Sequence, residues 1–292
     1  MKRFLIACTL WFASHSVANA TQVLTSIKPI QLIAIEIMQN TSSPEVILAS
    51  NTSPHDYALR PSDVKRIRNA DVIIWFGKDL EPFLSKVVEG QSNVLTLSKI
   101  EGLELREYQG DHHDHDGHDH GSHDPHFWLG YKPTMQVAKA IADMLAGMDA
   151  ANAQVYADNL KVFEDKLAAQ QQAIEKQLTP IKQDGYFVFH DAYGYFEQDF
   201  ALNQLGFFTV SPDRKPGAKT LISIRKALAS EQAKCVFSEP QFTPAVVESV
   251  TRGSNAKVGV LDPIGSDVQA VSGGYFILKQ NLADSFSHCL QR

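Results

Sequence analysis

Short apolar runs alternate with amphipathic, helix-like stretches along the first part of the chain. Residues 23–27, 46–48 and 71–76 have the length and composition of buried strands. A helical pattern follows the first run and ends near Gln39, and residues 61–69 form a shorter helix that begins with proline, whose missing N–H is harmless there. Strands that alternate with helices predict crossover connections and a mainly parallel sheet with both faces covered.

The same alternation returns in the last third of the chain. Apolar runs of strand length occupy residues 186–189, 207–210, 235–237 and 257–261. The predicted fold class is therefore α/β, with two parallel-sheet lobes. Ligands of such folds bind beyond the carboxyl ends of the strands, so the crevice between the lobes is the expected ligand site.

A single long helix is predicted between the two sets of strands. Residues 151–178 contain no glycine or proline, and Thr179 and Pro180 end the pattern. Six apolar residues form one stripe at spacings of three, four and seven: Tyr156, Leu160, Phe163, Leu167, Ile174 and Leu178. At 1.5 Å per residue the helix would be roughly 40 Å long. A rigid helix of this length would join the lobes and limit how far they can close on a ligand.

The N-terminus has the pattern of a secretory signal peptide. Lys2 and Arg3 precede an apolar run in residues 4–13, and small residues follow at positions 18–20, which predicts cleavage after Ala20. The run is too short to span a bilayer comfortably, so no membrane insertion is expected. A lipoprotein reading, with acylation of Cys8, stays open as an alternative, although few apolar residues precede that cysteine.

These patterns divide the chain into four parts. We expect a signal peptide in residues 1–20, an N-terminal α/β lobe in residues 21–150, a connecting helix in residues 151–180 and a C-terminal α/β lobe in residues 181–292.

Charge and cysteine content fit an exported protein that binds cationic ligands. The formal net charge of -6 at pH 7 disfavours nucleic acid as a partner. Once Cys8 has left with the signal peptide, Cys235 and Cys289 remain, and an even number of cysteines in an oxidising compartment predicts a disulfide. Two buried free thiols are the alternative. A thiolate metal site is weaker, because the two residues do not have zinc-finger spacing.

The histidine-rich loop (residues 111–126) is the plainest chemical signal in the chain. Its sixteen residues hold seven of the 11 histidines and five aspartates, with no side chain that could anchor a core. Neutral imidazole binds zinc and similar transition metals, and neighbouring carboxylates offset their charge. The segment therefore predicts metal capture, with a solvated low-complexity loop as the alternative. Its secondary metal ligands would be His112, His113, His115, His118, His120 and His123.

Three histidines outside the middle of that loop stand where loops leave strands or enter folded segments. His55 follows the second strand, His126 ends the histidine-rich loop, and His190 ends the first strand of the second lobe. Each alone would be an ordinary histidine, but together they form a plausible three-imidazole site. Asp262 follows another strand of the second lobe, and either it or water would be the fourth ligand; a turn cap is the alternative role for Asp262.

The chain resembles the zinc-binding members of the solute-binding proteins that serve bacterial ABC metal importers. Motifs in the same order cover nearly its whole length: PHDYALRPSD at 54–63, the histidine-rich loop, DPHFWL at 124–129, FHDAYGYF at 189–196, SEPQF at 238–242 and LDPIG at 261–265. The resemblance implies two α/β lobes bridged by a rigid helix, with zinc in the cleft and His55, His126 and His190 as ligands. Some zinc-binding members carry an acidic residue where Pro54 stands, which leaves the fourth ligand open.

The resemblance also implies a function. The protein would capture Zn²⁺ in the periplasm with high affinity and deliver it to an ABC permease, with the cytoplasmic ATPase as an indirect partner; we expect it to act as a monomer. Three imidazoles favour zinc over manganese, which prefers oxygen donors. Glu239 and Asp191 are candidates for orienting an imidazole. A zinc hydrolase is the rival class, but the sequence has no HExxH helix and no nucleophile elbow. A periplasmic zinc buffer without a transporter would bind metal identically.

Overall fold

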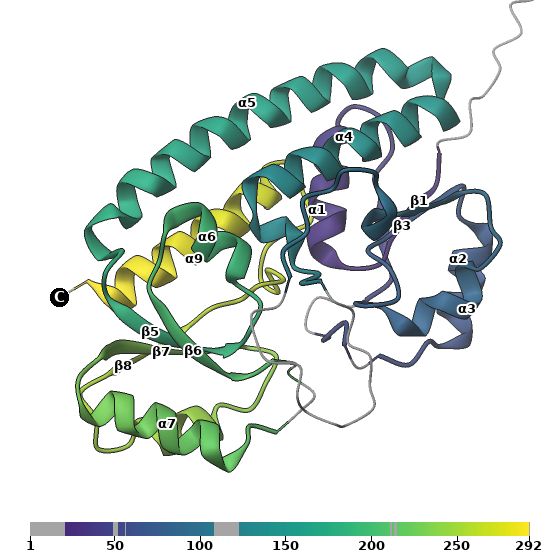
Figure 1. The fold of residues 1–292 in the computed structure, drawn as a ribbon. Coiled ribbons are helices and arrows are strands. Elements are labelled where there is room, and N and C mark those ends of the chain that lie inside the picture. The colour runs from purple at the N-terminus through teal and green to yellow at the C-terminus, as the bar shows by residue number, and fades with distance from the viewer. Residues whose placement is uncertain are drawn as a thin grey trace, which may run out of the picture.

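The computed structural model describes residues 21–48, 52–55, 57–107, 123–210, 212 and 215–291. Its strands form two four-stranded sheets, one before and one after the long helix α5 (Ala153–Leu178) in chain order, as Figure 1 shows. All neighbouring strands within these sheets run parallel. The predicted α/β class with two parallel-sheet lobes is confirmed. The predicted signal peptide lies outside the described residues.

The sheet of the N-terminal lobe has the strand order β2–β1–β3–β4. Its elements in chain order are β1 (Val23–Thr25), α1 (Lys28–Ile37), β2 (Glu45–Val46), α2 (Pro61–Asn69), β3 (Val72–Trp75), a 3-10 turn (Pro82–Leu84), α3 (Ser85–Val88), β4 (Val94–Thr96) and a second 3-10 turn (Leu97–Lys99). The first three strands and two helices lie where the pattern predicts them. Strand β4 was not predicted, although its three residues, VLT, are the same as those of β1.

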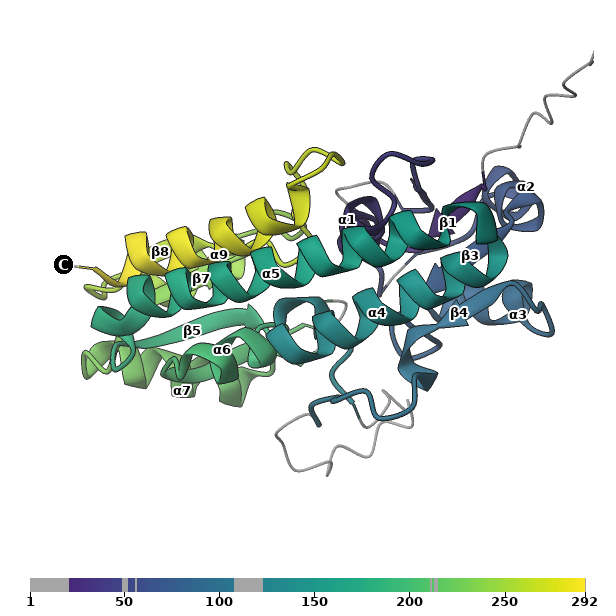
Figure 2. The same ribbon diagram turned by 90° about the horizontal axis from the view of Figure 1, so that it is seen from above.

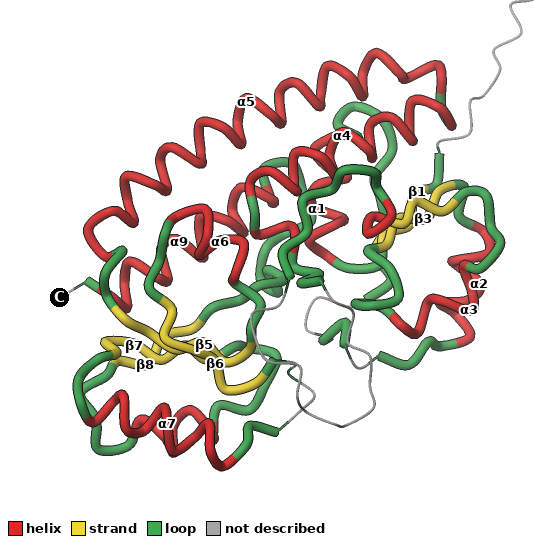
Figure 3. Tube along the Cα trace, viewed as in Figure 1, coloured by secondary structure: helices red, strands yellow, loops and turns green. Residues whose placement is uncertain are grey.

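The sheet of the C-terminal lobe has the order β6–β5–β7–β8. Its elements are β5 (Gly185–His190), α6 (Gly194–Phe200), β6 (Gln204–Thr209), α7 (Ala218–Ala229), β7 (Ala233–Ser238), α8 (Ala245–Thr251), β8 (Lys257–Val260) and α9 (Gly274–Leu290). Each of the four strands overlaps a predicted run. Figure 3 shows loops from both lobes meeting between the two groups of strands.

Helix α5 runs along both lobes without interruption, and α4 (Tyr131–Met148) and α9 pack alongside it (Figures 1 and 2). Five of the six predicted stripe residues are buried: Tyr156, Phe163, Leu167, Ile174 and Leu178. Lys161 and Asp165 form an exposed ion pair one turn apart on the opposite side. Short 3-10 turns precede and follow the helix (Ala150–Asn152 and Thr179–Ile181). Among the described residues, no helix has both the length and the apolar character needed to cross a bilayer.

One hydrophobic core passes through both lobes. Buried side chains of β1 and β3 belong to the same continuous cluster as those of β7 and α9, and a smaller cluster lies against α7 and α8. Polar contacts cross the same boundary: Lys28 Nζ donates to the carbonyl oxygen of Ser266 (2.9 Å), and the N–H of Gly273 donates to Glu36 Oε1 (2.5 Å). Separating the lobes would expose apolar surface and break these bonds, so the fold opposes a wide opening.

A buried carboxyl group lies at the carboxyl ends of β1 and β3. Glu81 is 0 % exposed and accepts hydrogen bonds from Ser26 Oγ (2.5 Å) and from the backbone N–H of Gly77 (3.0 Å). Burial raises the pKa of Glu81 to about 7, and the hydrogen bonds oppose that shift.

We expect Glu81→Gln to gain stability relative to the wild type as the pH rises. The folded state holds the proton of Glu81 more tightly than the unfolded chain does, so ionisation at alkaline pH destabilises the fold, whereas glutamine does not ionise. Denaturant unfolding at pH 5 and pH 8.5 should show the wild type losing about 2.5 kcal/mol of unfolding free energy relative to the variant. A difference that is the same at both pH values would contradict the raised pKa.

Candidate metal centre

Three histidines from distant parts of the sequence meet between the lobes. His55, His126 and His190 each offer a ring nitrogen, and these three atoms lie within 4.8 Å of one another. The ring centroids are 5.8 Å apart for His55 and His126, 6.0 Å for His55 and His190, and 5.2 Å for His126 and His190. The structure thus brings together the three imidazoles that sequence patterns single out.

Each imidazole is placed by a different local structure. His190 is the last residue of the buried strand β5. His126 directly precedes the 3-10 turn Phe127–Leu129, whose three side chains are all 0 % exposed, and Trp128 Nε1 in that turn donates to the carbonyl oxygen of Pro263 (2.7 Å). His55 lies in the turn that follows β2, where its N–H donates to Ser53 Oγ (3.3 Å). Two of the three rings therefore stand on well-packed backbone.

The spacing of the rings suits zinc. His126 Nε2 and His190 Nε2 are 3.4 Å apart. In a tetrahedral site with Zn–N distances of about 2.0–2.1 Å, two ligand nitrogens are separated by about 3.3–3.4 Å. Two neutral imidazole nitrogens this close together gain no hydrogen bond unless one carries the proton, whereas both can point their lone pairs at a shared cation.

Buried carboxylates orient two of the rings. His126 Nδ1 donates to Asp124 Oδ1 (2.7 Å), and His190 Nδ1 donates to Glu239 Oε1 (2.6 Å). A proton on Nδ1 leaves the lone pair on Nε2, which is the atom that faces the other ring. Tyr193 in turn donates its hydroxyl proton to Glu239 Oε1 (3.1 Å). These contacts give both rings the tautomer that a metal ligand needs.

The guanidinium of Arg106 contacts the carboxylate of Asp124 and also that of Asp191. Arg106 Nη1 donates to Asp124 Oδ2 (2.8 Å), and Arg106 Nη2 reaches Asp191 Oδ1 (3.4 Å). Burial alone would lower the pKa of the Arg106 guanidinium, but the negative charges of Asp191 and Asp124 outweigh it and raise that pKa. Burial raises the pKa of Asp191, and the charge of Arg106 opposes the rise.

Asp262 lies outside the group of ligand atoms that the three histidines form. Its Oδ1 accepts hydrogen bonds from the backbone N–H of Gly265 (3.1 Å) and from Gln241 Nε2 (2.7 Å), and its Oδ2 accepts from the N–H of Ser266 (2.5 Å). This is the turn-capping role that the sequence left open for it. Its role as the fourth metal ligand stays a prediction.

A small cavity of about 20 Å³ adjoins the three rings. Such a volume holds about one water molecule. Much of its wall is apolar, formed by Pro54, Trp128, Pro212, Phe242, Pro263 and Ile264. The site has room for an ion that has lost its hydration shell but little room for a second reactant.

The secondary ligands predicted in the histidine-rich loop fall mostly outside the described residues. His112, His113, His115, His118 and His120 belong to residues 108–122, for which the structure gives no description. His123 is described, and its backbone pairs with that of Glu107 in an isolated antiparallel bridge. This bridge pairs a residue that precedes the histidine-rich loop with a residue near the end of the loop.

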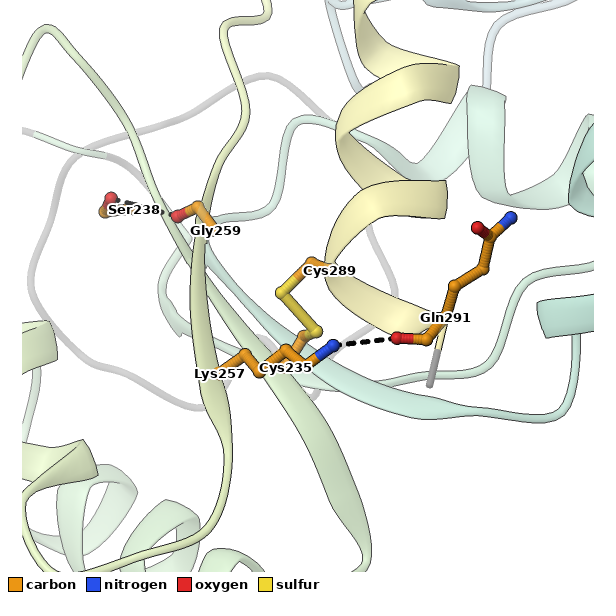
Figure 4. The surroundings of a disulfide bond; sticks show 6 residues. All are labelled: Cys235, Ser238, Lys257, Gly259, Cys289 and Gln291. Atoms are coloured by element: carbon orange, nitrogen blue, oxygen red, sulfur yellow. Dashed lines mark hydrogen bonds between the residues drawn. A yellow bond between two sulfur atoms is a disulfide. The ribbon is translucent and has the colours of Figure 1, made fainter.

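The predicted disulfide between Cys235 and Cys289 is present. It connects β7 to the last turn of α9, with Cα atoms 6.0 Å apart. Figure 4 shows the bond beside Lys257 and Gln291, whose contact ties the start of β8 to the residue that follows α9. The C-terminal helix is thereby fastened covalently to the sheet that carries His190.

Sequence patterns missed two residues of this site. Asp124 could have been found, because an aspartate two residues before a ligand histidine and next to proline is placed to form a turn around it. Arg106 gives no local signal, since it is a single arginine before a low-complexity segment and its contact with Asp191 spans 85 positions. Glu239 contacts an imidazole as expected, whereas Asp191 contacts Arg106.

Known proteins that are similar to this chain include zinc-uptake proteins. The profile of the family described as "Zinc-uptake complex component A periplasmic" matches residues 23–289. The chain is 39 % identical over 311 residues to the high-affinity zinc uptake system protein ZnuA of Yersinia pestis, covering 100 % of this chain and 98 % of the relative. It is 40 % identical to the protein of that name from Haemophilus ducreyi, over 94 % of each chain.

Solved structures share the fold. A crystal structure of ZnuA superposes with a TM-score of 0.76 at 26 % identity and covers 92 % of this chain and 100 % of that one. The periplasmic zinc-binding protein TroA from Treponema pallidum superposes with a TM-score of 0.81 at 19 % identity, over 94 % of this chain and 100 % of that one. The second likeness is one of fold alone.

Proposed function

Since this chain belongs to the family of periplasmic components A of zinc-uptake complexes, we propose that it captures Zn²⁺ in the periplasm and hands it to the membrane permease of an ABC importer. It is a solute-binding protein and not an enzyme. The observation that carries the proposal is the convergence of three imidazole nitrogens within 4.8 Å at the boundary between two lobes. The zinc ion is the cargo of this site.

In this proposal His55, His126 and His190 bind one Zn²⁺ through neutral rings. Asp124 and Glu239 hold the rings of His126 and His190 in place, which raises their basicity as ligands. Three nitrogen donors favour zinc over manganese, which prefers more oxygen ligands. Water is the better candidate for the fourth ligand, because both oxygens of Asp262 already accept hydrogen bonds within its own turn.

The histidine-rich loop binds further zinc more weakly in this account. Its secondary ligands are His112, His113, His115, His118, His120 and His123. A loop must lose conformational freedom to wrap a metal, whereas ligands on packed backbone are already placed. The loop therefore adds capacity without creating the tightest site.

We expect deletion of residues 111–122 to leave the tightest zinc site intact. Calorimetric titration of the metal-free deletion variant should keep one tight equivalent and lose the weaker ones, because His55, His126 and His190 are all retained. His55→Ala in the full-length chain serves as the comparison and should weaken the tight site while it leaves the weaker ones. The reverse pattern, in which the deletion abolishes tight binding, would contradict the assignment.

The cleavage site, the bounds of the lobes and the oligomeric state are parts of the same proposal. Residues 1–20 are a signal peptide that is cleaved after Ala20, residues 21–150 and 181–292 form the lobes, and residues 151–180 form the connecting helix. The mature protein acts as a monomer without a nucleic-acid partner. Mass spectrometry of the exported protein tests the cleavage site, with Thr21 expected as the first residue.

A transport assay distinguishes an importer subunit from a periplasmic zinc buffer that works without a transporter. Proteoliposomes that contain the permease and ATPase of the proposed importer should accumulate zinc only when the zinc-loaded protein and ATP are both supplied. The His190→Ala variant should support far less uptake at the same zinc concentration. Uptake that does not depend on the protein would contradict the proposed role.

A further inference from the structure

Arg106 spans the boundary between the lobes directly behind the three histidines. Its guanidinium contacts Asp124 on the N-terminal side (2.8 Å) and Asp191 on the C-terminal side (3.4 Å). Asp124 is 0 % exposed and Asp191 is 1 % exposed. Asp124 holds the ring of His126, and Asp191 directly follows His190. One side chain therefore connects the aspartate that holds the ring of His126 with the residue that follows His190 in the other lobe.

The backbone of Arg106 belongs to the same connection. Its N–H donates to the hydroxyl oxygen of Tyr195 on α6 (2.8 Å), and that hydroxyl donates to the carbonyl oxygen of Asp124 (2.7 Å). The N–H of Asp124 donates to the carbonyl oxygen of Arg106 (2.7 Å). A tyrosine of the C-terminal lobe thus clamps the segments that carry Arg106 and Asp124.

The backbone of Gly194 lies directly against the guanidinium of Arg106. A Cβ atom added to this first residue of α6 would lie 2.0 Å from Arg106 Cζ and 2.3 Å from Arg106 Nε. Any side chain at position 194 would displace the guanidinium, and because two buried carboxylates hold it, displacement would break ion pairs. The close approach of the backbone to Arg106 depends on glycine at this position.

The charges explain why a cation is needed here. Asp124 and Asp191 repel each other across the lobe boundary. Arg106 offsets that repulsion and offers two N–H groups that reach both carboxylates at once. Without it, two buried carboxylates would face each other with no cation between them.

We propose that Arg106 is a positioning residue that sets the separation of His126 and His190 across the lobe boundary, and so the geometry of the metal site. The inference rests on the proposed zinc-binding function and adds a specific residue to it. Residues that orient metal ligands change metal affinity by about 10–100-fold when they are replaced. Arg106 acts through Asp124 and Asp191 and does not touch the ion.

The test compares Arg106→Met with Arg66→Met. Arg66 also forms an ion pair, with Glu45 (2.8 Å), but at the surface of the N-terminal lobe, so its replacement controls for the loss of an arginine. We expect Arg106→Met to weaken zinc binding by about 10–100-fold in a chelator competition assay. It should also change the visible absorption of the Co²⁺-loaded protein, which reports coordination geometry. Arg106→Lys keeps the charge and one ion pair, and should recover part of the affinity.

A second variant moves the guanidinium without removing it. Gly194→Ala should weaken zinc binding and alter the Co²⁺ spectrum in the same direction as Arg106→Met. Because both changes act through one contact, the double variant should bind zinc as weakly as Arg106→Met alone. Losses that add together would mean that the two residues act separately, which contradicts the proposal.

The outcomes separate this inference from the function on which it rests. If Arg106→Met matches Arg66→Met in zinc affinity and in Co²⁺ spectrum, while His190→Ala abolishes tight binding, the inference is wrong and the zinc site stands. If His190→Ala leaves tight binding unchanged, the proposed site itself is wrong. Thermal unfolding of each variant shows whether the variant is still folded in the zinc assay. A loss of zinc affinity that comes only from unfolding, with an unchanged Co²⁺ spectrum, would also overturn the inference.

Discussion

Replacing His190 with alanine is expected to weaken zinc binding by more than about a hundredfold. Changes to residues that merely orient a metal ligand cost about 10–100-fold, and removal of a ligand should exceed that range. His190 ends β5 and places its Nε2 3.4 Å from His126 Nε2, so alanine removes one of the two best-placed donors. It also leaves the buried Glu239 without the imidazole that donates a hydrogen bond to its carboxylate.

The measurement is a competition titration of the metal-free protein against a chelator of known zinc affinity. His288→Ala is the matched control, because His288 is an exposed histidine on α9 that is not part of the three-histidine group. The control should bind zinc like the wild type. If the two variants have the same affinity, His190 is not a ligand.

Removing the disulfide is expected to destabilise the protein by about 4 kcal/mol. The bond joins residues separated by 54 positions, and the chain-entropy model gives about this value for a loop of that size. In the variant Cys235→Ala with Cys289→Ala, the last turn of α9 would be held to the sheet by packing and by contacts such as that between Lys257 Nζ of β8 and the carbonyl oxygen of Gln291 (2.7 Å), which Figure 4 shows. Denaturant unfolding of the metal-free proteins measures the difference.

A thiol reductant provides the control for this prediction. Reduction should destabilise the wild type by a similar amount and should leave the double-alanine variant unchanged. Zinc affinity of the folded variant should remain that of the wild type, because Cys235 lies within β7 and away from the strand end that leads to Glu239. A wild type that unfolds at the same denaturant concentration with and without reductant would contradict a stabilising bond.

Much of the fold follows from local patterns. The apolar stripe of α5 and the absence of glycine and proline within it predict one long helix, and the buried runs predict three N-terminal and four C-terminal strands. Two features were not predicted. Strand β4 has the same three residues as β1 but is only half-buried in the fold. Strand β6 begins at Gln204, earlier than the apolar run that marks it, and includes Gly206 at φ 149°.

Residues of the site could be predicted from the sequence where they lie at the carboxyl end of a strand. His190 was identified because parallel strands bring their carboxyl ends to one edge, and the same rule places Glu239 beside it after β7. Arg106 could not be found in this way. Its partners lie 18 and 85 positions away, and only tertiary packing brings the two aspartates to one guanidinium. The role of Asp262 is a second case, since its turn is visible in the sequence but its distance from the imidazoles is not.

The central claim is that imidazoles of both lobes bind one zinc ion. A crystal of the protein loaded with one equivalent of zinc, measured with X-rays at the zinc absorption edge, tests it most directly through the anomalous difference map. We expect a single strong peak about 2.0–2.1 Å from a ring nitrogen of each of His55, His126 and His190. A peak bound elsewhere, or one that contacts the histidines of only one lobe, would contradict it.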